Sequence, residues 1–264
     1  MDDWKWYKPS MPQYTRYSPH QILAGFKIED VYMQIKNARL SLLFMERDSY
    51  KPFVTKDDDL HTAHIRSKFL FDAMANYNYC IDLSWQFLYL YYSYIDYGYD
   101  DYGMIQEEDF YEKETKSCRP STLKKRLVSA GQEGKWREIS SFLDEPLTDE
   151  IRNAYNYIKH RGTYHVKGLG IQGDDKFPTV FSGNVPTLKF ITRETIDLDE
   201  WREKLINFDI SFYQYFNKLI QELMPDDFTE GTIIIDNLPS ISKKLEEWYR
   251  KINDGQDNKL EGRL

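Results

Sequence analysis

Apolar residues that recur at alternating three- and four-residue steps are the feature that most limits how this chain can fold. Between residues 58 and 95 they stay on one helical face without a break. The positions on this face are Leu60, Ala63, Ser67, Leu70, Met74, Tyr77, Ile81, Trp85 and Leu88. Because a half-buried strand would need a two-residue period, the pattern predicts one α-helix, more than about 50 Å long.

The same period predicts further helices along the chain. Ser18 and Pro19 suit an N-cap and a first helical position, for a helix that runs to about Arg47. Thr148 is the expected N-cap of a later helix, which Gly162 is expected to end. The remaining helices are predicted at about residues 120–130, 135–144, 148–161, 199–225 and 240–252. Four or five main helices of this kind favour an all-α fold, an antiparallel helical bundle.

The segments between these helices differ in composition. Residues 1–17 are rich in Pro, Trp and Tyr, and we expect an irregular N-terminal arm before a bundle of residues 18–225. Residues 96–114 carry eight acids and predict an exposed acidic loop. Residues 163–195 mix apolar residues with Gly, Pro, Thr and Asn, and predict an extended insertion with a small β-hairpin. For residues 226–264 we expect a C-terminal helix and a frayed polar tail.

Composition restricts the class of function. The chain has 43 acids against 35 Lys and Arg, a net charge of −8, which argues against a broad nucleic-acid-coating surface. Cys80 and Cys118 show no metal-ligand spacing and suit free thiols in a reducing compartment. The first residues do not resemble a secretory signal, and no run of about 18 apolar residues occurs. We therefore expect a cytoplasmic protein with no membrane contact.

Residues 151–170 form a locally cationic stretch in this acidic chain. They contain no Asp or Glu. Their basic and histidine residues are Arg152, Lys159, His160, Arg161, His165 and Lys167. The stretch is therefore the place where the sequence indicates contact with an anion. Further on, Gly168, Gly170 and Gly173 have the spacing of a dinucleotide-binding loop, but no clear strand precedes them and no helix follows, so no cofactor is predicted.

A helical arrangement sorts the first part of this stretch into two faces. Ile151, Ala154, Tyr155 and Ile158 fall on the side predicted to face the core. The opposite side collects Arg152, Asn153, Asn156, Lys159 and His160. A polar helix face is usually only solvated, but Asn is a poor choice for an exposed helix interior. A histidine beside cationic side chains also suits proton transfer next to a bound phosphate.

These residues resemble the signature of the HEPN superfamily, whose members are helical bundles that include ribonucleases and inactive binding modules. That signature is an Arg, usually followed by a polar residue, and a His after four to six further residues. Here Asn153 follows Arg152, and seven residues separate Arg152 from His160. The resemblance implies Arg152 and His160 as the catalytic pair. It implies phosphate or RNA contact by Asn153, Asn156, Lys159, Arg161 and His165.

The resemblance also implies an activity and partners. The activity is metal-independent RNA cleavage in bacterial defence or toxin–antitoxin biology, with RNA and an antitoxin-type protein as partners. Arg152 and His160 lie about 12 Å apart along one helix axis, so we expect a homodimer in which they approach each other across a two-fold axis. The alternative is a non-catalytic module of the same fold, in which this face binds RNA or another protein.

A third and weaker interpretation is a metal-dependent hydrolase. His61 and His64 share one helix face, with Asp57 and Asp58 nearby. The sequence offers no identifiable third or fourth ligand, and acids suit the N-terminus of a helix because of its dipole. No metal is therefore predicted.

Overall fold

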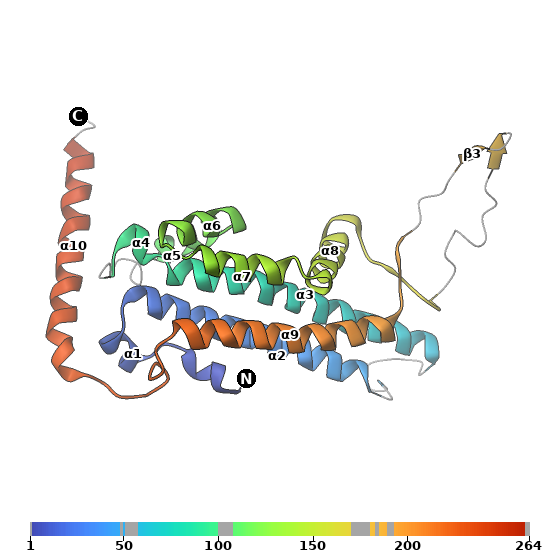
Figure 1. Ribbon diagram of the computed structural model, residues 1–264, viewed down its shortest axis with the longest axis horizontal. Coiled ribbons are helices and arrows are strands. Elements are labelled where there is room, and N and C mark those ends of the chain that lie inside the picture. The colour runs from blue at the N-terminus through green and yellow to red at the C-terminus, as the bar shows by residue number, and fades with distance from the viewer. Residues whose placement is uncertain are drawn as a thin grey trace. The chain divides into compact units, whose positions relative to one another are not determined.

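The computed structural model describes residues 2–47, 50, 58–99, 108–169, 180–182, 185–188 and 193–261. The chain is mainly helical (Figure 1), which confirms the predicted all-α class. Its helices are η1 (Asp2–Tyr7), α1 (Met11–Arg16), α2 (Pro19–Met45), α3 (Asp59–Tyr91), α4 (Tyr94–Tyr97), α5 (Glu108–Ser117), α6 (Pro120–Ser129), α7 (Glu133–Leu143), α8 (Pro146–Arg161), α9 (Leu198–Leu223), η5 (Ile235–Asn237) and α10 (Leu238–Glu261). Its strands are β1 (His165–Val166), β2 (Val180–Ser182), β3 (Val185–Leu188) and β4 (Thr195–Ile196).

The chain divides into two compact units. The first unit comprises residues 1–33, 80–142 and 213–264, and the second comprises residues 34–79 and 143–212. The long helices α2, α3 and α9 each contribute one part to each unit. The packing of all the helices as one antiparallel bundle stays a prediction.

The sequence predicts an irregular N-terminal arm, and this prediction is wrong. The arm contains the helices η1 and α1. Trp4 is buried in the first unit, where its ring lies 5.2 Å from that of Phe216 and its Nε1 donates to Asn217 Oδ1 at 3.1 Å. At the start of α1 the Ser10 backbone N–H donates to Gln13 Oε1 at 3.0 Å. Aromatic burial and local capping therefore outweigh the irregular character of the composition.

Gly25 allows α2 to approach the rest of the first unit closely. A Cβ at this position would lie 2.7 Å from the carbonyl oxygen of Tyr7 and 2.9 Å from Cζ of Phe228. Both distances are shorter than van der Waals contact. Only glycine fits here without displacement of the backbone.

The helix boundaries confirm most of the predicted helices and correct some ends. Helix α8 begins at Pro146 after Glu145, so Thr148 is a buried residue inside the helix and not its N-cap. The fixed φ of proline already suits the first helical position. Gly162 follows the last helical residue with a φ of 100°, as predicted. Helix α10 continues to Glu261, beyond residue 252, because backbone hydrogen bonds do not need the apolar pattern on which the prediction rested.

Much of the predicted acidic loop is helical, since α4 and α5 include residues 94–97 and 108–117. Residues 100–107 lie outside the described part of the chain. Two acids of this segment pair with buried Arg126: Glu114 at 3.0 Å and Asp96 at 2.6 Å. Arg126 also donates to the carbonyl oxygen of Tyr89 at 2.7 Å. Some of these acids therefore compensate a buried cation and are not only a solvated loop.

The predicted insertion contains two strand pairs. Strands β2 and β3 form the expected antiparallel hairpin. Strands β1 and β4 form a parallel pair that the sequence analysis did not predict, with His165 opposite Thr195 and Val166 opposite Ile196. The rest of residues 170–192 lies outside the described residues, as does most of the glycine-rich stretch.

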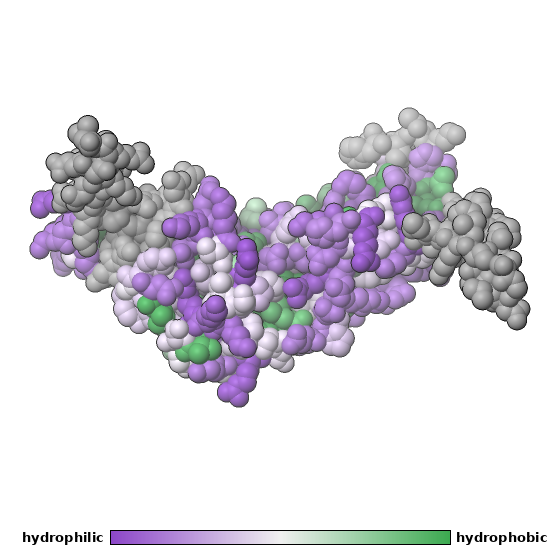
Figure 2. Space-filling model, turned by 90° about the horizontal axis from the view of Figure 1, so that it is seen from above, coloured by the Kyte–Doolittle hydropathy of each residue, from purple (hydrophilic) through white to green (hydrophobic). Residues whose placement is uncertain are grey.

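Some exposed apolar side chains are neighbours in the chain, such as Ile233, Ile234 and Ile235 before α10. Figure 2 shows one face of the molecule, on which hydrophilic residues predominate and hydrophobic residues form small separate groups. Within the described part of the chain, no helix has the length and apolar character needed to cross a membrane.

Candidate functional site

Helix α8 is held in the second unit by one apolar face and by polar contacts on its sides. Ile151 and Ala154 are buried as predicted, whereas Tyr155 and Ile158 are only half-buried. The Glu150 carboxylate pairs with the Lys204 ammonium of α9 at 2.7 Å. These contacts leave the last turn of α8 open to solvent on one side.

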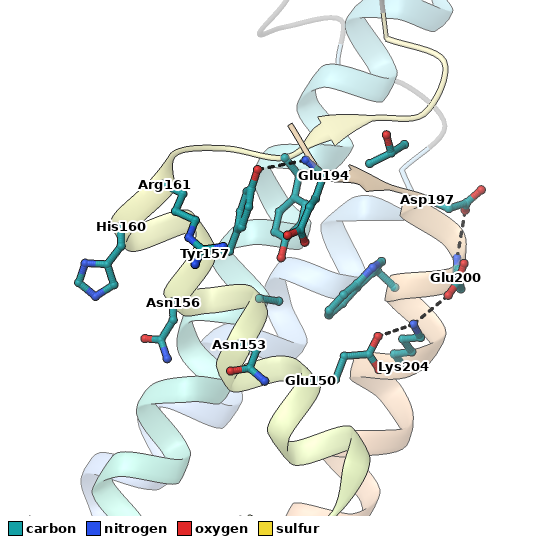
Figure 3. A pocket seen from close by; sticks show the side chains of 14 residues that line it. Glu150, Asn153, Asn156, Tyr157, His160, Arg161, Glu194, Asp197, Glu200 and Lys204 are labelled. Atoms are coloured by element: carbon teal, nitrogen blue, oxygen red, sulfur yellow. Dashed lines mark hydrogen bonds and ion pairs between the residues drawn. The ribbon is translucent and has the colours of Figure 1, made fainter. Parts of the chain in front are cut away.

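A cavity of about 630 Å³ lies in the second unit beside this helix (Figure 3). Its wall is formed by α8, by the residues around β1 and β4, and by the first turns of α9. The lining residues are Glu150, Asn153, Ala154, Asn156, Tyr157, His160, Arg161, Tyr164, Glu194, Thr195, Asp197, Glu200, Trp201 and Lys204.

Four of the seven predicted site residues line this cavity: Asn153, Asn156, His160 and Arg161. Figure 3 shows that His160, Asn156 and Asn153 extend from α8 on the side away from Lys204. Asn153 donates through Nδ2 to Asp149 one turn earlier, at 2.8 Å. The outer rim of the cavity is therefore an exposed amide and imidazole surface.

The other three predicted residues are not brought into the cavity. Arg152 is half-buried on α8, and Lys159 is exposed on the same helix without lining the cavity. His165 lies in β1, where its backbone N–H donates to the carbonyl oxygen of Glu194 at 2.9 Å. Within one chain, the cavity thus contains His160 but not Arg152.

The last turn of α8 has three consecutive basic side chains that no described carboxylate neutralises. Lys159, His160 and Arg161 form no ion pair with any residue in the described ranges. The Arg161 guanidinium instead lies 5.9 Å from the centroid of the Tyr157 ring. Cations at a helix C-terminus are stabilised by the helix dipole. These side chains therefore have a structural role even without a ligand.

The opposite wall is acidic, which the acid-free stretch of sequence did not indicate. Its carboxylates belong to Glu194, Asp197 and Glu200, and Glu150 near the start of α8 adds a fourth. Glu150 and Glu200 hold Lys204 between them, at 2.7 and 2.8 Å, and raise the pKa of that ammonium. Hydrogen bonds from the Glu200 backbone and from Lys167 lower the pKa of the Asp197 carboxyl. Three of the four acids therefore have partners inside the protein.

Glu194 meets an aromatic pair at the end of α8. The rings of Tyr157 and Tyr164 are stacked with centroids 4.4 Å apart, and the Glu194 backbone N–H donates to the Tyr157 hydroxyl at 3.0 Å. Burial, and after it the Glu194 charge, raises the pKa of Tyr164 to about 12. At neutral pH its phenol is therefore a hydrogen-bond donor and not an anion.

The cavity combines a cationic end, an acidic wall and an aromatic centre. Parallel pairing of β1 with β4 brings Glu194 and Asp197 to the end of α8, across a sequence separation of more than thirty residues. Short strands of two residues leave almost no sequence signal, so these acids could not have been predicted. Tyr157 could have been, because it lies one turn before the cationic residues.

No metal-binding group emerges from the described residues. Among them, no three His, Cys, Asp or Glu side chains are arranged to hold a metal ion. His61 contacts Asp58 through Nδ1 at 2.6 Å, and His64 is exposed on α3, while Asp57 lies outside the described residues. The metal-hydrolase interpretation therefore gains no support from the structure.

Comparison of the chain with protein-family models, curated proteins and solved structures found no match. The site is therefore interpreted from its own residues.

Proposed function

We propose that the protein is an RNA-binding helical module in which the last turn of α8 contacts the phosphate backbone. The observation that supports this proposal is the run of Lys159, His160 and Arg161, which has no ion-pair partner among the described residues. Elsewhere in the second unit, cations such as Lys204 and Arg39 are paired with carboxylates. An exposed run of unpaired cations favours a polyanion, because binding releases the counterions of the phosphates.

The acidic wall restricts how such a strand can lie. Phosphates would be repelled by Glu194 and by the other carboxylates, so the backbone would follow the α8 side of the cavity. A carboxylate that faces a nucleotide accepts hydrogen bonds from ribose hydroxyls or base amino groups. The 2′-hydroxyl of RNA supplies such a donor, and this argument favours RNA over DNA.

Binding without cleavage is the better-supported form of the proposal. Arg152 does not line the cavity, and eight residues separate it from His160, about 12 Å along the helix. One chain therefore does not direct both side chains at one phosphate. The resemblance to HEPN proteins remains the basis for expecting RNA as the ligand.

A test is the affinity of the full chain for a fluorescent single-stranded RNA of about 20 nucleotides, measured by anisotropy over a range of salt. The double variant Lys159→Ala/Arg161→Ala should bind more weakly, and its salt slope should fall by roughly 1.4, because about 0.7 is lost per phosphate contact on a single strand. The matched control is Lys243→Ala/Arg250→Ala, which removes the same charge from exposed positions on α10. Absence of RNA binding at low salt, or equal weakening in both variants, would reject the proposal.

A second candidate, metal-independent RNA cleavage, is favoured by the exposure of His160 on the outer rim (Figure 3). An exposed imidazole is accessible to Arg152 of a second copy of the chain. This candidate predicts a dimer by light scattering and RNA cleavage that persists in EDTA. Cleavage should disappear in Arg152→Ala and in His160→Ala. A monomer that binds RNA without cutting it would leave the binding proposal alone.

A further inference from the structure

A second cavity, of about 640 Å³, lies in the first unit at the junction of α5 and α6. Its lining residues are Glu112, Lys113, Lys116, Ser117, Arg119, Ser121 and Thr122. Each of them is charged or carries a hydroxyl group, and none is apolar. The cavity is open to solvent, and the carbon atoms of these side chains form part of its wall, so it suits a small ligand held by a polar group.

The charge of the lining is positive. The lining has three cations and one carboxylate, so the cavity has a net charge of +2, although the whole chain has a net charge of −8. Glu112 pairs with Lys116 at 2.8 Å. Lys113 and Arg119 form no ion pair with a carboxylate in the described part of the chain. The excess charge in the cavity is therefore available to an anion.

The backbone that carries these cations is held in place. Buried Arg126 of α6 binds Glu114 of α5 at 3.0 Å, which ties the two helices together. In the link between them, the Arg119 backbone N–H donates to the Thr122 hydroxyl at 2.9 Å, and that hydroxyl contacts the Ser117 carbonyl oxygen at 2.8 Å. Because this link is held in place, less conformational entropy is lost when a ligand binds.

We propose that this cavity binds a phosphate group, either free phosphate or the phosphate ester of a small polar molecule. The Arg119 guanidinium matches two phosphate oxygens with its planar N–H groups, and Lys113 adds a second charge. The Ser121 hydroxyl is a further donor. The volume exceeds that of phosphate alone and accommodates the polar part of an ester.

The ligand binds without covalent chemistry. Cys118 lies in the same link, but burial raises the pKa of its thiol to about 12. At neutral pH this thiol is protonated and is a poor nucleophile. The cavity is thus a binding site, independent of the surface on α8.

The test is a calorimetric titration of the full chain with inorganic phosphate and, separately, with glycerol phosphate, at constant ionic strength set by chloride. Both probes should saturate the native protein, and the tighter one identifies whether the free ion or the ester is preferred. Lys113→Ala and Arg119→Ala should each weaken binding by roughly tenfold or more, the range of a charge-assisted hydrogen bond. Arg119→Lys keeps the charge without the planar donor pair and should recover binding only in part.

The matched control is Lys124→Ala/Lys125→Ala, which removes cations from α6 outside the cavity. Its affinity should stay within about twofold of the native protein, and urea unfolding should show that every variant is folded. Equal weakening in the control would mean general attraction of anions and would overturn the proposal. So would the absence of binding by either probe at about 10 mM in the folded native protein.

Discussion

His20 should make the protein less stable as the pH falls from neutrality towards 4. The side chain is 4% exposed and is enclosed by the rings of Tyr91, Tyr94 and Tyr99, with centroids 5.5, 5.0 and 5.4 Å from its own. Its Nδ1 atom has no hydrogen-bond partner among the described residues. Burial lowers the pKa of this imidazole from 6.5 to about 4, so the folded protein holds it neutral.

The direction and size of this change in stability follow from the different proton affinities of His20 in the folded and unfolded chains. Between pH 6.5 and pH 4 the unfolded chain binds the proton and the folded chain does not, so stability falls as the pH decreases through this window. At about 1.4 kcal/mol per pH unit, the full loss is roughly 3 kcal/mol. Roughly 2 kcal/mol of it should be lost between pH 7.5 and pH 5.

The measurement is urea unfolding at these two pH values for the native protein and for His20→Phe. Phenylalanine retains an aromatic ring among the three tyrosines but cannot be protonated. Carboxylates titrate in both proteins, so the difference between them isolates His20. The stability of the variant relative to the native protein should rise by about 2 kcal/mol on going from pH 7.5 to pH 5.

His64, which is exposed on α3, provides the control variant His64→Gln. Its unfolding should follow that of the native protein at both pH values. If His20→Phe loses stability with falling pH as steeply as the native protein, the buried neutral imidazole is not the cause, and the reasoning from the tyrosine cluster is wrong.

Other predictions follow from single contacts. Arg126→Ala leaves the Glu114 carboxylate, whose side chain is 7% exposed, without its buried partner and should lower the free energy of unfolding by about 3–5 kcal/mol in urea. Gly25→Ala places a Cβ 2.7 Å from a carbonyl oxygen and should destabilise by about 2 kcal/mol or more. In Gly134→Ala of α7 the added Cβ has no atom within 4 Å, so the free energy of unfolding should stay unchanged or rise by up to about 1 kcal/mol. A greater loss of stability in Gly134→Ala than in Gly25→Ala would contradict the packing. Glu194→Ala, which removes the acceptor oxygens, should reduce the preference for RNA over DNA of the same sequence, measured as the ratio of dissociation constants; an unchanged ratio would mean that this carboxylate does not contact the ribose.

Helix positions were predictable because they depend on local spacing. The apolar steps along residues 58–95 and the Ser-Pro pair before α2 are visible in the sequence, and the structure has helices there. Gly162 ends α8 because only glycine readily adopts its positive φ, which is also a local property. The N-terminal arm was not predictable, because its helices depend on burial of Trp4 against a helix more than 200 residues away.

For the candidate site, the sequence by itself determined the polar face of α8, including Asn156, His160 and Arg161, since the helical period assigns each side chain to a face. Only the tertiary structure decided what this face meets. The pairing of β1 with β4 places Glu194 and Asp197 beside a segment that has no acid of its own. Electrostatic environment depends on distance in space, and these two acids are more than thirty residues from His160 along the chain.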